Sequence, residues 1–326
     1  MDLPAELQIR WILRRTASLL SFGAEPVRGL VTPTPEFFPD HFDGSPKSVA
    51  ALLERVQEHA GLSHLEVELA IVTPEGEAKS ASSCSSGACG GGGGAPIDAK
   101  QGRVARKDDG SYVVAVGAGE VKNPVVLTTA LARASAAMFM VESSAFEAMT
   151  PAEREPATDL AAVLLGFGVL AANGSYIYAK GCGGVQVHSA TKMPVDELTL
   201  ALAIFCKLHG VSDRACAKHL QLTPRAHFEE ASVWASSNAP VLRMLRADPS
   251  TIEGDDFKLG GSRSWLARVL GVGKKATITR ATDDDLAELE LSLKAAPQRA
   301  SGPADAAKAR RIAEIRALVD ESLDQR

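Results

Sequence analysis

Residues 153–173, EREPATDLAAVLLGFGVLAAN, constrain the fold more than any other part of the chain. The length and composition of this stretch predict a helix, and its centre is apolar on every side rather than along one stripe. A helix of this kind is stable in water only where other elements cover all of its faces. We therefore expect it to be buried on all sides.

Amphipathic helical patterns precede and follow this segment. They carry apolar residues at helical spacing, and several begin or end at a serine, proline or glycine. The predicted helices cover residues 7–22, 46–60, 124–142, 194–209, 212–220 and 223–237. The third of these is rich in alanine, and its expected apolar stripe consists of Leu127, Leu131, Ala134, Met138 and Val141.

Strand patterns are confined to a short part of the chain between the second and third predicted helices. Residues 65–73 alternate apolar and charged side chains, and residues 111–117 form a second apolar run, with a short third strand in 102–107. Strands and helices do not alternate along the sequence. The order predicts an α+β fold dominated by helices, in which a small antiparallel sheet is followed by a helical bundle.

The remaining segments predict the domain organisation. Residues 80–100 are rich in Ser, Gly and Cys, which is typical of a flexible insert. We expect one α+β domain over residues 1–245, a linker and weakly structured segment over 246–303, and an amphipathic helix over 304–326. A helix this short is marginal alone in water, so it must dock either on its own domain or on a partner protein.

Composition excludes several classes of protein. The net charge is −5 and the sequence pI is about 5.9, with no basic stripe, so nucleic acid is not an expected partner. No apolar run reaches the about 20 residues that span a bilayer, and charged residues interrupt the N-terminal segment where a signal peptide would be apolar. We therefore expect a cytoplasmic protein without a membrane span, whereas its oligomeric state and its partner stay open.

Cysteine and histidine residues are weak metal candidates. Cys84 and Cys89 lie in the insert, and Cys182 lies close to His188 in KGCGGVQVH. A zinc site from these four would require the glycine-rich insert to fold onto a later segment, which conformational entropy opposes. Free thiols are the simpler interpretation, and Cys206 in an apolar helix is interpreted as a small core residue.

Several segments agree in order with a known group of proteins. RWILRRTASLL, PTPEFFPDHFDGSPKSVAALLERV, TDLAAVLLGFGVLAAN and DELTLALAIFCKLHG resemble segments of mostly uncharacterised bacterial proteins that are similar to zinc metallopeptidases. The resemblance covers roughly residues 7–245 and implies a core like that of the zincins. In that group a His-Glu-x-x-His helix places two imidazoles on one face for Zn²⁺, with the Glu as general base.

The resemblance places this motif on LARASA, where its functional groups are absent. Ala132 and Ala136 stand at the histidine positions and Arg133 at the glutamate position. The fixed charge of an arginine there repels a cation. Asp159, on the following helix, is where a third ligand would come from, and one carboxylate does not hold zinc alone. The alternative interpretation is that this segment is an alanine-rich core helix that has no relation to a metal-binding motif.

The resemblance therefore implies a non-catalytic protein without a cofactor that acts by binding another protein, as a pseudoenzyme, scaffold or regulator. The expected contact surfaces are the vacated cleft, the insert or the C-terminal helix. The alternative hypothesis is a metal-dependent hydrolase whose site has moved to the surroundings of Cys182 and His188.

Overall fold

The computed structural model describes residues 3–72, 78–80, 103–181, 184–254 and 257–260. Contacts divide the chain into two units, Met1–Gly271 and Val272–Arg326, and all described residues belong to the first. The C-terminal helix predicted over 304–326, nearly all of the predicted insert and most of the predicted linker lie outside the described residues.

Helices form most of the described part of the chain, so the predicted α+β class with dominant helix is confirmed. The long helices begin and end close to the residues that the sequence indicates. Ser45 caps the second helix by accepting a hydrogen bond from the backbone N–H of Ser48 at 3.2 Å, and Gly61 ends it in the left-handed conformation. The longer helices are α1 (Glu6–Ser21), α2 (Pro46–Ala60), α4 (Pro124–Glu142), α7 (Val195–His209), α9 (Leu222–Ser237) and α10 (Ala239–Ala247). The short ones are α3 (Ala118–Val121), α8 (Asp213–Ala217) and α11 (Ser250–Glu253), with a 3₁₀ turn at Ala145–Ala148.

The predicted central helix is present but is not continuous. It consists of α5 (Pro151–Ala162), a wide turn at Val163–Phe167 and α6 (Gly168–Gly174). The break falls at Gly166, whose φ of 101° is strained for any other residue. A Cβ atom there would lie 2.3 Å from the carbonyl oxygen of Gly29. The break therefore lets an N-terminal loop lie directly against this helix.

Two helical stretches, Pro124–Glu142 and Pro151–Gly174, are long and apolar enough to cross a membrane by length and composition alone. The apolar window of the second is entirely buried inside the protein, which confirms the expected burial on all sides. Packing therefore accounts for its apolar sequence, and the absence of a membrane span stays a prediction.

The main sheet is mixed, and this corrects the predicted antiparallel sheet. Its order is β2 (Ala78–Ser80), β1 (Val67–Val72), β4 (Tyr112–Gly117) and β3 (Val104–Arg106). The two central strands β1 and β4 are parallel, whereas both outer pairs are antiparallel. Parallel strands need a connection of about a dozen residues or more, and the long segment between β1 and β4 meets this need. A second, unpredicted sheet is the hairpin of β5 (Ile177–Gly181) and β6 (Gly184–His188).

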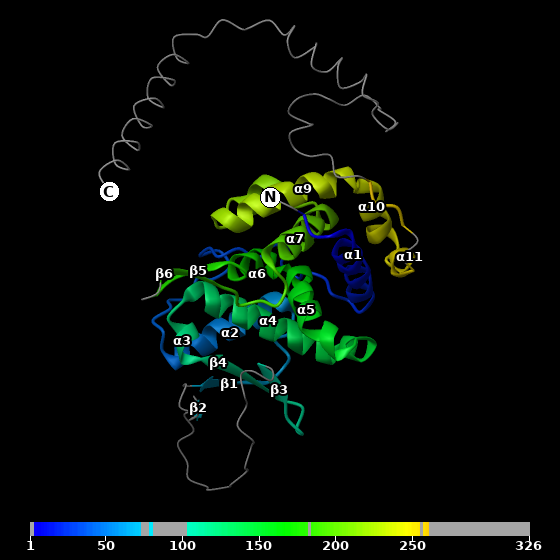
Figure 1. Ribbon diagram of the computed structural model, residues 1–326. Coiled ribbons are helices and arrows are strands. Elements are labelled where there is room, and N and C mark those ends of the chain that lie inside the picture. The colour runs from blue at the N-terminus through cyan, green and yellow to red at the C-terminus, as the bar shows by residue number, and fades with distance from the viewer. Residues whose placement is uncertain (1–2, 73–77, 81–102, 182–183, 255–256, 261–326) are drawn as a thin grey trace, which may run out of the picture. The chain divides into compact units, whose positions relative to one another are not determined.

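Helices lie in layers on one side of the main sheet (Figure 1). The helix α4 contacts β4, α2, α5 and α6, and α7 packs between α6 and α9. The described part of the predicted linker is packed rather than extended, because α11 contacts α1 and the side chains of Ile252 and Phe257 are buried.

Candidate functional site

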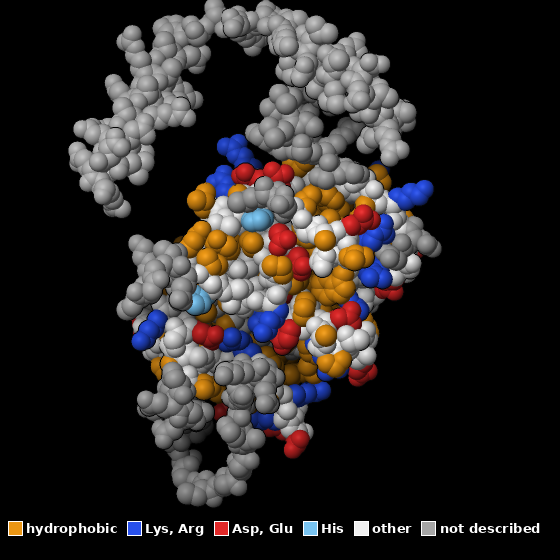
Figure 2. Space-filling model, viewed as in Figure 1, with side chains coloured by type: hydrophobic (Ala, Val, Ile, Leu, Met, Phe, Trp, Pro, Cys, Tyr) orange, Lys and Arg blue, Asp and Glu red, His pale blue; other side chains and the backbone are white. Residues whose placement is uncertain are grey.

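A cleft of about 820 Å³ opens beside α4. Its walls come from β3, α3, α5 and the segment that leads from β6 to α7. Side chains of both charge signs lie next to one another in the middle of the face shown in Figure 2. It is larger than two other cavities of about 590 and 320 Å³, and it is lined by Arg133, the arginine at the glutamate position that the resemblance implies.

The helix α4 turns different faces to the core and to the cleft. Ala132 and Ala136 have no exposed surface and belong to the core, whereas Arg133 and Ala137 line the cleft. Residues four apart lie on one face of a helix, so the last two form one stripe. Of the three positions onto which the resemblance would place the motif, only Arg133 therefore faces the cleft, and both histidine positions face the core.

Arg133 is held by two carboxylates from α5. Its Nε donates to Asp159, and its second terminal nitrogen donates to Glu155 at 2.7 Å. Asp159 is fully buried and also accepts hydrogen bonds from the backbone N–H groups of Lys192 at 2.6 Å and Met193 at 2.8 Å. The carboxylate that we considered as a third metal ligand is therefore bonded by three donors.

Burial and charge act in opposite directions on this pair. Burial raises the pKa of Asp159, and the Arg133 guanidinium and the two backbone N–H groups oppose that rise. Burial alone would lower the pKa of Arg133, but the charges of Asp159 and Glu155 outweigh it and raise that pKa. Arg133 is therefore a permanent cation.

A second ion pair forms another wall of the cleft. Arg103 donates from both terminal nitrogens to Glu120, at 2.6 and 2.9 Å, and Glu120 also accepts from the backbone N–H of Gly117 at 2.9 Å. Burial raises the pKa of Glu120, but the hydrogen bonds and charge of Arg103 outweigh it and lower the pKa overall. The charge of Arg133 adds to this lowering, so its field reaches across the cleft.

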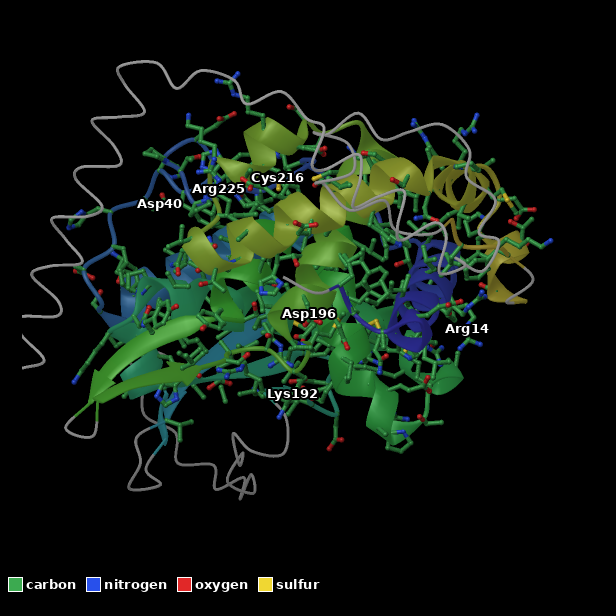
Figure 3. All side chains as sticks on the ribbon, turned by 45° about the horizontal axis from the view of Figure 1, so that its top comes forward. Arg14, Asp40, Lys192, Asp196, Cys216 and Arg225 are labelled. Atoms are coloured by element: carbon green, nitrogen blue, oxygen red, sulfur yellow. The ribbon has the colours of Figure 1, made fainter. Side chains whose placement is uncertain are left out.

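Two further basic side chains line the rim of the cleft. Lys192 lies on the loop before α7, well apart from Cys216 and Arg225 in the view of Figure 3. Lys192 is exposed and has no ion-pair partner among the described residues. His188, which we considered as a metal candidate, is exposed at the end of β6.

The described residues do not fit a zinc ion. Within the described ranges, no group of three His, Cys, Asp or Glu side chains is placed to hold a metal. On the cleft face of α4, Arg133 presents a guanidinium that bonds to Asp159. A guanidinium cannot ligate a metal. Cys84, Cys89 and Cys182 lie outside the described residues, and Cys206 is fully buried, as its interpretation as a core residue requires.

Sequence reasoning missed four charged residues of the cleft, which are Arg103, Glu120, Glu155 and Lys192. One of them had a signal in the sequence, because Glu155 precedes Asp159 by four residues and the two therefore lie on one face of a helix. The other three come from separate elements, and only the tertiary fold brings them together.

No family model, curated protein or solved structure matches this chain. The functional argument therefore depends on the geometry of the cleft.

Proposed function

We propose that the protein is a non-catalytic, metallopeptidase-like protein that acts by binding, with the cleft beside α4 as a contact surface. The observation that supports this most is the Arg133 guanidinium, a fixed cation on the cleft face of α4 that bonds to Asp159 and Glu155. The C-terminal helix predicted over residues 304–326 is a second expected contact surface.

A guanidinium can hold a carboxylate in place as a metal ion does, but it cannot catalyse hydrolysis as a metal ion does. It neutralises a buried carboxylate and fixes its direction, because its planar N–H groups match carboxylate oxygens. It has no lone pair or open coordination position, so it cannot activate a water molecule as bound zinc does. Its fixed charge also repels a second cation.

The hydroxyl groups of the cleft are not activated as nucleophiles. Thr158 donates to the carbonyl of Arg154 at 2.8 Å, and Thr191 donates to the carbonyl of Met193 at 2.9 Å. Ser189 likewise donates to the carbonyl of Thr191 at 2.9 Å. A nucleophilic hydroxyl instead donates to a general base. The charge and hydrogen bonds of Arg103 lower the pKa of Glu120, which weakens this carboxylate as a base. The carboxylate of Glu155 is engaged by Arg133.

A metal-dependent hydrolase near Cys182 and His188 is the second candidate. The position of His188 on the same cleft favours it. Cys182 lies outside the described residues, so the two have no described contact.

Metal analysis separates the two candidates. We expect the full-length protein to purify without stoichiometric zinc, and added zinc to leave the melting temperature unchanged, because a ligand stabilises only the state that binds it. The variants His188→Ala and Cys182→Ser serve as controls. Stoichiometric zinc in the wild type that either variant loses would overturn the proposal in favour of the hydrolase.

A further inference from the structure

The two carboxylates that hold Arg133 differ in their freedom to move. Asp159 has no exposed side-chain surface and is fixed by two backbone N–H groups. The side chain of Glu155 is 53% exposed, and among the described contacts it bonds to Arg133 alone. One carboxylate is therefore a permanent part of the core, and the other can be exchanged for a different anion.

Arg133 has N–H donors that its described hydrogen bonds do not use and that such an anion can accept from. Its guanidinium carries five N–H groups, and the described contacts use Nε for Asp159 and one terminal nitrogen for Glu155. The bond to Glu155 involves a single carboxylate oxygen. A free carboxylate or phosphate can instead take two parallel N–H groups, which is the stronger arrangement.

Lys192 provides a second cation beside the first. Its backbone N–H donates to the same Asp159 that orients Arg133, so one buried carboxylate fixes the positions of both residues. Its side chain is exposed and lines the same cleft. The exposed His188 adds a further hydrogen-bonding group on this rim.

We propose that the cleft binds its ligand through an anionic oxygen group, a carboxylate or a phosphate, that displaces Glu155 from Arg133 and pairs with Lys192. The exchange leaves the arginine paired with an anion throughout, because the Glu155 side chain turns to solvent as the anionic group of the ligand arrives. This inference rests on the proposed function and specifies the ligand of the same cleft.

The exchange has a consequence that a structural role for Glu155 does not share. Glu155 competes with the ligand for the guanidinium, so removal of its charge strengthens binding. The variant Glu155→Gln should bind an anion about two- to fivefold more tightly, the range expected for loss of a half-exposed ion pair. The variant Lys192→Ala should bind it more weakly by a similar factor.

The test is an NMR titration of the full-length protein that follows the ¹⁵N–¹H signal of the Arg133 Nε. The probes are trialanine with a free C-terminus, the same peptide with an amidated C-terminus, and inorganic phosphate, each at millimolar concentration. Glu229→Gln and Lys218→Ala are matched controls. Glu229 is an exposed glutamate that is ion-paired to Arg225 on α9, and Lys218 is an exposed lysine that lines a different cavity.

We expect the signal to shift with the free peptide, with phosphate, or with both, and the amidated peptide to leave it unchanged. The responding probe identifies the kind of anionic group. Absence of a shift with both anions, or a Glu155→Gln variant that binds no more tightly than Glu229→Gln, would overturn the inference. The proposed function is judged separately by zinc content, which none of these titrations measures.

Discussion

Two arginines line the cleft, and the ion pair of Arg103 with Glu120 differs in burial from that of Arg133 with Asp159. The side chains of Arg103 and Glu120 are 21% and 25% exposed, and they meet through two parallel hydrogen bonds. The side chains of Arg133 and Asp159 are 11% and 0% exposed, and they meet through one described bond. The pair with the better hydrogen-bond geometry is therefore the one that water can reach.

Burial, rather than geometry, should decide how strongly the fold depends on each pair. When one partner of a partly exposed pair is removed, water solvates the other. When one partner of a buried pair is removed, the remaining charge is left without compensation. The comparison predicts that substitutions in the Arg103–Glu120 pair lower the stability of the fold far less than substitutions in the Arg133–Asp159 pair.

The largest effect is expected for Asp159→Ala. This change removes the fixed partner of Arg133 and the acceptor of two backbone N–H groups, and we expect a loss of about 3–5 kcal/mol in the free energy of unfolding. Urea unfolding followed by tryptophan fluorescence measures it. Glu120→Ala is the matched change in the other pair, with an expected loss of about 1 kcal/mol. If the two variants lost equal free energies of unfolding, burial would not determine how strongly the fold depends on each ion pair.

The second prediction concerns the orientation of α4. Histidines at Arg133 and Ala137 would lie one turn apart on the cleft face, close to Asp159, and we expect this double variant to gain saturable zinc binding in calorimetry. Histidines at Ala132 and Ala136 enter the packed core instead. That pair should bind no zinc and should cost about 1–3 kcal/mol per substitution. Zinc binding by the second pair would show that the orientation is wrong.

Much of the fold could be predicted from the sequence, because helix ends have local signals. Ser45, Gly61 and Gly210 stop or start helices through their own hydrogen bonds or backbone angles. The parallel pairing of β1 with β4 had no such signal, since it depends on the path of the chain between them. Whether two paired strands are parallel or antiparallel is set by the connection between them and not by the residues of either strand.

The site was less predictable than the fold for a related reason. The sequence indicated Arg133 and Asp159 as candidate site residues, but it did not predict which face of α4 lines the cleft. That helix is nearly apolar all round, so no polar stripe marks its exposed side. The cleft face follows from packing against β4, α5 and α6, which sequence periodicity does not contain.

The third prediction uses pH to isolate the partly exposed pair. The pKa of Glu120 is lowered overall in the folded protein, so its charge contributes stability above its ordinary value of 4.5, and that contribution is lost as the pH falls. The variant Glu120→Gln lacks this contribution at every pH. We expect the urea midpoints of wild type and variant to differ at pH 7 by about 1 kcal/mol in free energy and to converge in acid. A difference that persists at low pH would show that Glu120 acts through its shape rather than its charge.

The smallest effect is expected for an ion pair outside the cleft. Glu153 bonds to Arg15 of α1, and its side chain is 26% exposed. Hydrogen bonds from Arg15 and Thr150 lower the pKa of Glu153 from 4.5 to about 2. Glu153→Gln keeps the side-chain oxygen that caps α5 and removes the charge, so it isolates the ion pair.

We expect Glu153→Gln to lose about 0.2–1 kcal/mol at pH 7. The difference from wild type should shrink as the pH falls below 4.5 and disappear below about 2, because the wild-type carboxyl is then neutral like the glutamine. Urea unfolding across this range measures it, with Glu229→Gln as a control in a helical pair whose side chains are more than half exposed. If Glu153→Gln lost as much stability as Asp159→Ala, burial would not be what separates the ion pairs of this protein.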